Sequence, residues 1–155
     1  MTVSLFGHRE LDDFRIIEQI LTRKVNELLD ENEYVIFLVG RNGEFDELAA
    51  SVIKHAKRLR GDECCEMNLV LPYRVVDVEF YDNYYDSVFI PDELPPTIHP
   101  KRAIVAKNRI MIERSDEVVL YVNKDFGGAY EAYKYATKLG KRVVNLADLH
   151  SLPIQ

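Results

Sequence analysis

The chain has 155 residues, of which 47% are hydrophobic, and this length and composition favour one globular domain with a substantial core. Its net charge of -6 disfavours a general nucleic-acid binder, because such proteins usually carry a basic excess. The apolar runs are too short to cross a membrane, and the amino terminus lacks the pattern of a signal peptide, so a cytoplasmic location without membrane contact is expected. The two cysteines are adjacent, which predicts neither a structural disulfide nor a metal site.

Apolar runs and helical apolar spacing alternate along the chain. Glycines follow several of these segments, and Gly61 and Gly140 stand where helices are expected to end. The expected strands cover about 3–6, 34–39, 67–71, 117–122 and 142–146, and the expected helices about 16–29, 45–59, 101–114 and 129–139.

The stretch 73–99 interrupts this alternation with tyrosines, acids and prolines. A connection of this length inside a compact domain is usually functional or contains a short element, and residues 87–90 could form a short strand. Its tyrosines could stack on a base or close over a ligand, or they could simply pack the loop against the domain.

Strands that alternate with helices predict an α/β fold: a Rossmann-like three-layer sandwich with a mainly parallel five-stranded sheet. If the glycine-bearing turns after the first, second and fourth strands share a ligand, those strands must be neighbours. The order 3-2-1-4-5 satisfies this condition and has its switch point between strands one and four. The order 2-1-3-4-5 would separate strands two and four.

Each of these three turns carries candidate ligand-binding residues. After the first strand, Arg9 could pair with a phosphate or with a nearby aspartate, and His8 beside it could donate to a phosphate or transfer a proton. Gly127 and Gly128 could cradle a phosphate at a helix amino terminus, or could only permit a tight turn. The remaining candidates in the turns are Gly7, Gly40, Arg41, Asn42 and Asp46, of which Asp46 suits ribose hydroxyls or a helix cap.

The helix at 101–114 is basic, and such a charge run is usually a solvated face. The end of the second helix carries four cations that suit the helix dipole and are interpreted as structural. They are Lys54, Lys57, Arg58 and Arg60. The histidines show no metal-ligand spacing, so no metal site is expected.

Taken together, these motifs resemble the SLOG superfamily of Rossmann-like domains, in particular its YpsA-like branch, with DprA and the LOG enzymes as more distant relatives. The resemblance rests on Phe6-Gly7-His8-Arg9, on Gly40 with Asp46, Ala49 and Ala50, on Lys107 to Met111 with Asp116, and on Gly127-Gly128-Ala129. It gives weight to Asn108 and Arg109 as further ligand-binding residues. It implies that residues 1–155 form a single domain for a nucleotide-derived ligand such as NAD, ADP-ribose or a nucleoside monophosphate.

The leading expectation from the sequence is therefore a sensor or regulatory domain for such a small molecule, with a homodimer as one open arrangement. The alternative is a phosphoribohydrolase or N-glycosidase, but the LOG glutamate position falls on Ala132, which leaves Glu131, Asp46 and Glu47 as candidate acids. Whether the chain is an enzyme stays open. Single-stranded nucleic-acid binding, by analogy with DprA, is the least favoured function because of the acidic balance.

Overall fold

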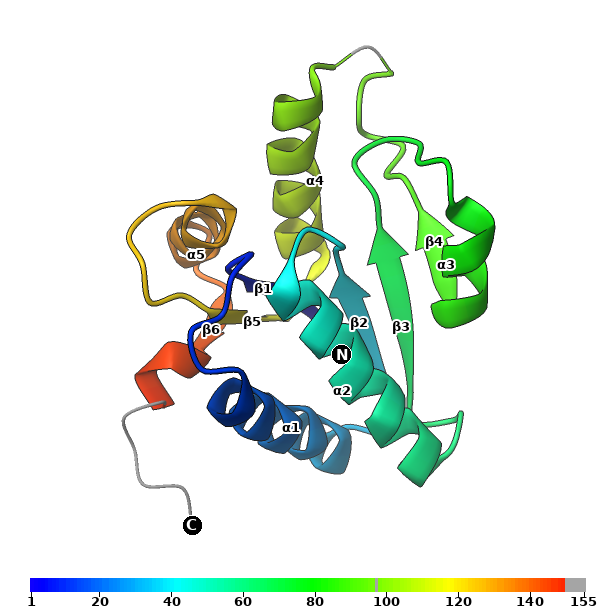
Figure 1. Ribbon diagram of the computed structural model, residues 1–155, viewed down its shortest axis with the longest axis vertical. Helices are drawn as coiled ribbons and strands as arrows, with labels where there is room; N and C mark the ends of the chain where they lie inside the picture. The colour runs from blue at the N-terminus through cyan, green and yellow to red at the C-terminus, as the bar shows by residue number, and fades with distance from the viewer. Residues whose placement is uncertain (97, 150–155) are drawn as a thin grey trace.

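The computed structural model describes residues 1–96 and 98–149. Strands and helices alternate through most of this part of the chain (Figure 1). The strands are β1 (Thr2–Gly7), β2 (Val35–Val39), β3 (Cys65–Val70), β4 (Ser87–Phe89), β5 (Glu117–Tyr121) and β6 (Arg142–Asn145). The helices are α1 (Phe14–Glu31), α2 (Glu44–Arg60), α3 (Val78–Tyr84), α4 (Pro100–Arg114) and α5 (Gly128–Lys138), followed by the 3-10 turn η1 (Leu146–Leu149).

The strands form one six-stranded sheet in the order β4-β3-β2-β1-β5-β6, and every neighbouring pair is parallel. β1 lies at the centre, where Val3 pairs with Phe37 of β2 on one side and Leu5 pairs with Val119 of β5 on the other. The connections from β1 and from β5 lead away in opposite directions along the sheet. The switch point of the fold is therefore between these two strands, where ligands usually bind in open α/β sheets.

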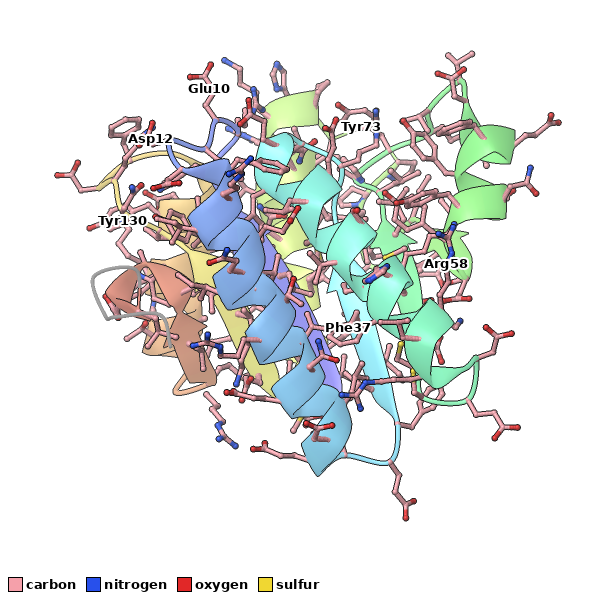
Figure 2. The ribbon with its side chains drawn as sticks, turned by 60° about the horizontal axis from the view of Figure 1, so that its bottom comes forward. Glu10, Asp12, Phe37, Arg58, Tyr73 and Tyr130 are labelled. Atoms are coloured by element: carbon pink, nitrogen blue, oxygen red, sulfur yellow. The ribbon has the colours of Figure 1, made fainter. Side chains whose placement is uncertain are left out.

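Helices cover both faces of the sheet and make a three-layer sandwich. Figure 2 shows α1 and α2 side by side over one face, where Leu21, Ile53 and Phe37 belong to one buried cluster. α4 and α5 cover the other face, and Met111 and Ala132 pack there against Leu120. Because every helix joins two parallel strands, its amino terminus points to the carboxyl edge of the sheet.

The α/β class predicted from the sequence is confirmed, and the five expected strands lie in the expected relative order. The short strand considered at 87–90 forms as β4, and it makes the sheet one strand larger than the predicted five because it pairs with β3. Leu71 N donates to Phe89 O at 2.9 Å just beyond the paired residues. The stretch expected as one long connection also contains α3. No buried residue marks this short helix, so no apolar period in the sequence announces it.

Candidate functional site

A cavity of about 450 Å³ opens at the carboxyl edge of the sheet, over the switch point between β1 and β5. The turns after β1, β2 and β5 and one face of α4 line it, so segments far apart in the sequence converge there. Its lining residues are Leu5, Phe6, Gly7, His8, Arg9, Glu10, Gly40, Asn42, Asp46, Ile104, Lys107, Asn108, Lys124, Phe126, Gly127, Gly128 and Ala129.

The turn after β1 is held tightly against its neighbours. A Cβ at Gly7 would overlap the Phe45 ring, so only glycine lets β1 and α2 approach this closely. His8 Nε2 accepts a hydrogen bond from Asn123 N at 3.2 Å, which ties this turn to the one after β5. Burial lowers the pKa of His8, and the nearby Lys124 ammonium lowers it further, against a smaller opposing effect of Asp12. The imidazole is therefore neutral near pH 7, and Nδ1 carries its proton.

The floor of the cavity combines the turn after β2 with a buried cation from α4. The carboxylate there is that of Asp46, and the cation is Lys107. Asp46 Oδ2 accepts from Asn42 N at 2.7 Å, and the same carboxylate interacts electrostatically with Lys107. Lys107 is only 2% exposed, and burial lowers its pKa to about 8, although Asp46 acts in the opposite direction. A Cβ at Gly40 would lie 3.0 Å from Lys107 Nζ and 3.1 Å from Asp46 Oδ2, so a side chain there would crowd both charged groups.

The amino terminus of α2 is already occupied by the chain itself. Glu44 N donates to Arg9 O at 2.9 Å, and the Glu44 carboxylate accepts from Leu11 N at 2.8 Å. Gly43 allows this contact, since a Cβ there would lie 2.5 Å from Arg9 Cα. This terminus therefore holds the Arg9 loop in place, and its first turn carries carboxylates, which disfavours phosphate there.

The amino terminus of α5 is open by comparison. Gly127 precedes the helix with φ 92°, a conformation that favours glycine, and it makes no side-chain cap. Within the described residues, a Cβ on Gly128 would meet nothing within 4 Å. Packing therefore does not explain Gly128, whereas close approach of a ligand to the first N–H groups of α5 would. Lys124 lines the same end of the cavity, and so does Phe126, which is 66% exposed.

α4 supplies the remaining wall through Ile104, Lys107 and Asn108. Within the described part of the chain, the buried Oδ1 of Asn108 has no hydrogen-bond partner. A buried carbonyl oxygen without a donor is costly, so it marks a place where a ligand N–H or O–H group, or a water molecule, would be stabilised.

The cavity brings together nine of the residues predicted as ligand-binding and leaves two outside. Arg41 is exposed and points to α3, where its NH1 donates to Tyr81 OH at 3.4 Å. Arg109 lies over the Tyr135 ring at 4.9 Å, so it braces α4 against α5. The nine that line the cavity are Gly7, His8, Arg9, Gly40, Asn42, Asp46, Asn108, Gly127 and Gly128.

Of the candidate acids, Asp46 lines the cavity and the two glutamates do not. Glu131 is exposed and pairs with Lys134 at 3.1 Å along α5, and Glu47 is an exposed residue of α2. The loop tyrosines are also absent from the lining: Tyr81, Tyr84 and Tyr85 pack on one another, which agrees with the packing interpretation of this segment.

Among the cavity residues that sequence reasoning did not predict as ligand-binding are Lys107, Lys124 and Phe126. Lys107 stood in a charge run that resembled a solvated face, and only the tertiary structure buries it. Lys124 and Phe126 lie in the turn before the glycine pair, and their position directly after a central strand was the signal available for both.

No protein-family model matches the sequence, and no curated protein matches it. The fold is similar to solved structures of DNA processing protein A (DprA) from two bacteria. The Helicobacter pylori protein, described as having a unique single-stranded DNA binding mode, aligns with 92% of this chain and 63% of its own at 16% identity and a TM-score of 0.62. The Streptococcus pneumoniae protein aligns with 99% of this chain and 62% of its own at 13% identity and a TM-score of 0.54.

The chain thus spans less than two thirds of both DprA structures, and the likeness is one of fold: a DprA-like Rossmann-type domain. At these identities the likeness shows the fold alone, so the resemblance to SLOG domains and to their YpsA-like branch stays a prediction from the sequence. Two expectations from the sequence are wrong against this comparison, namely small-molecule sensing as the leading function and nucleic acid as a disfavoured partner. The first relied on the glycine-bearing turns and the family resemblance. The second relied on the net charge of -6, which is a sum over the whole chain and does not describe the cavity.

Two further features concern membranes and metals. Among the helices that the structure describes, none combines the length and apolar character needed to cross a membrane. The described residues also contain no group of three or more histidine, cysteine, aspartate or glutamate side chains placed to hold a metal ion.

Proposed function

We propose that this chain binds single-stranded DNA, with one phosphate at the Gly127-Gly128 turn and the adjoining base on Phe126. Proteins that bind single strands combine a cationic groove for the backbone with aromatic rings on which unpaired bases stack. Arg9, Lys107 and Lys124 supply cations around the cavity. The observation that carries the proposal is Phe126, a large apolar ring left 66% exposed beside an open helix amino terminus.

The other lining residues have supporting roles in this proposal. The Asp46 carboxylate attracts the buried Lys107 ammonium, His8 connects the turns after β1 and β5, and the Oδ1 of Asn108 accepts from a base or sugar. A paired base in a duplex is not free to stack on a protein ring, so the arrangement favours an unpaired strand. The YpsA-like branch, the single domain over 1–155 and the cytoplasmic location remain predictions from the sequence.

The test compares two exposed phenylalanines. Phe126→Ala removes the stacking ring at the cavity, and the matched control Phe80→Ala removes a ring that is 69% exposed on α3 and absent from the lining. Loss of a base–aromatic stack of about 1–3 kcal/mol should raise the Kd for a labelled oligothymidylate roughly tenfold in the first variant. Fluorescence anisotropy at low salt measures this change, and the control variant should bind like the parent protein.

Three results would contradict the proposal. One is no binding of the single strand by the parent protein at micromolar concentrations. The second is an equal loss of affinity in both variants, which would show that the Phe126 ring contributes no more to binding than the Phe80 ring. Preference for a duplex of the same length would also contradict the stacking geometry.

A further inference from the structure

The first turn of α4 carries positive charges at the end of the helix where the dipole favours negative ones. Lys101 and Arg102 stand there with no acidic residue, although the amino end of a helix is partially positive and favours carboxylates. The His99 side chain accepts from Lys101 N at 3.2 Å and caps the helix, so capping does not need these cations. Helix stability therefore gives no reason for their presence, and residues that break a local rule of this kind often serve function.

Both side chains are exposed, and no ion pair with another described residue neutralises either of them. The opposite end of α4 differs, since Arg114 suits the dipole there and pairs with Glu93 at 2.9 Å. Between residues 100 and 112, α4 has cations and no acid at all. This part of the helix is therefore a local positive surface on an acidic protein.

This surface continues the wall of the cavity. Positions 101, 104 and 108 share one helix face, and Ile104 and Asn108 line the cavity. Figure 1 shows the amino-terminal half of α4 rising beyond the carboxyl ends of the strands, so Lys101 lies one turn further out than Ile104. At 1.5 Å per residue, Lys101 is about 10 Å along the helix from Asn108, which corresponds to about three phosphates at the 3.4 Å spacing of a stacked strand.

We propose that Lys101 and Arg102 form a second contact for the phosphodiester backbone, which receives the strand as it leaves the cavity along α4. The inference rests on the proposed function and specifies how a longer strand is held. A strand of about two nucleotides occupies the cavity alone, and a strand of about twelve nucleotides reaches both contacts. Longer strands should therefore bind more tightly and with a steeper dependence on salt.

The experiment compares the Lys101→Gln/Arg102→Gln variant with the parent protein on these two lengths of oligothymidylate. Each phosphate contact on a single strand contributes about 0.7 to the slope of log K against log salt, so the variant should lose roughly 1.4 of this slope on the long strand. Its affinity for the short strand should not change. Lys138→Gln/Arg58→Gln is the matched control, because it removes the same charge from exposed positions that do not line the cavity.

A second variant separates this role from a structural one. Lys101→Glu/Arg102→Glu places carboxylates where the dipole of α4 favours them, so the melting temperature should stay equal or rise while long-strand affinity falls more than in the glutamine variant. An unchanged salt slope in the glutamine variant, or an equal loss in the control, overturns the inference. If the parent protein binds neither strand, the proposed function itself is wrong; if it binds both equally, only the second contact is.

Discussion

Lys107 is the residue whose charge the cavity controls most directly. Burial lowers its pKa to about 8, from an ordinary value of 10.5, while Asp46 limits the decrease. The ammonium attracts a phosphate only while it is protonated, so we expect affinity for the single strand to be steady up to about pH 7. Above about pH 8 the Kd should rise by up to about tenfold per pH unit, because binding must then take up a proton. Anisotropy titrations between pH 6 and pH 9.5, in steps of about half a unit, measure this profile.

Stability should move in the opposite direction over the same range, which distinguishes lost binding from lost folding. Because the folded-state pKa of Lys107 is depressed, the unfolded chain binds more protons between about pH 8 and pH 10.5, and this group then stabilises the fold as pH rises. Lys107→Arg is the control, since a guanidinium stays charged. If the arginine variant, folded by circular dichroism, still loses affinity above pH 8, another group is responsible.

Two glycines of the cavity should respond in opposite ways to the same small change. Gly128→Ala adds a Cβ that meets nothing within 4 Å among the described residues, so the melting temperature should be unchanged or slightly higher. The added methyl group would stand where a phosphate approaches the amino terminus of α5, and strand affinity should fall severalfold. Gly40→Ala should instead lower stability, because its Cβ lies 3.0 Å from Lys107 Nζ.

Thermal unfolding and anisotropy on both alanine variants decide between these roles. A Gly128→Ala protein that binds like the parent would mean that the ligand does not approach this turn. A Gly40→Ala protein of unchanged stability would mean that the Lys107 and Asp46 side chains move aside easily.

At the scale of elements, apolar periodicity explains which parts of the fold were predictable. α1 and α2 each bury a regular apolar stripe, and β5 is buried throughout. The local sequence of each of these elements therefore predicts whether it is a helix or a strand. α3 has no buried residue, and it packs through contacts such as Lys54 Nζ, 3.8 Å from the centre of the Tyr84 ring. The sequence indicated a short strand at 87–90, and β4 forms there over three residues. Its pairing with β3 is a contact that the local sequence does not specify.

The candidate site was also predictable in one part and unpredictable in another. The turns after β1, β2 and β5 could be placed together because the carboxyl ends of parallel neighbours share one edge. The direction of individual side chains could not be obtained in this way. Arg41 turns to Tyr81 and Arg109 to Tyr135, whereas Lys107 turns inward, and each choice depends on neighbours far away in the sequence.

For the whole molecule, net charge misleads because screening makes electrostatic attraction local. α1 has 18 residues, about 27 Å in length, and its last residue, Glu31, lies at the amino edge of the sheet, opposite the cavity. This separation exceeds the Debye length of about 8 Å at physiological salt several times over. The carboxylates at that edge contribute to the charge of -6 without repelling a strand at the carboxyl edge.

Neutralising Glu31 and Glu33 to glutamine should therefore change the Kd for a single strand by less than about twofold at 0.15 M salt. Neutralising Glu10, an exposed residue that lines the cavity, should tighten binding severalfold because its repulsion acts at short range. Anisotropy at two salt concentrations compares the variants, and the effect of Glu10→Gln should shrink at the higher one. Equal gains in affinity from both sets would mean that the total charge of the molecule, and not the cavity, governs its encounter with DNA.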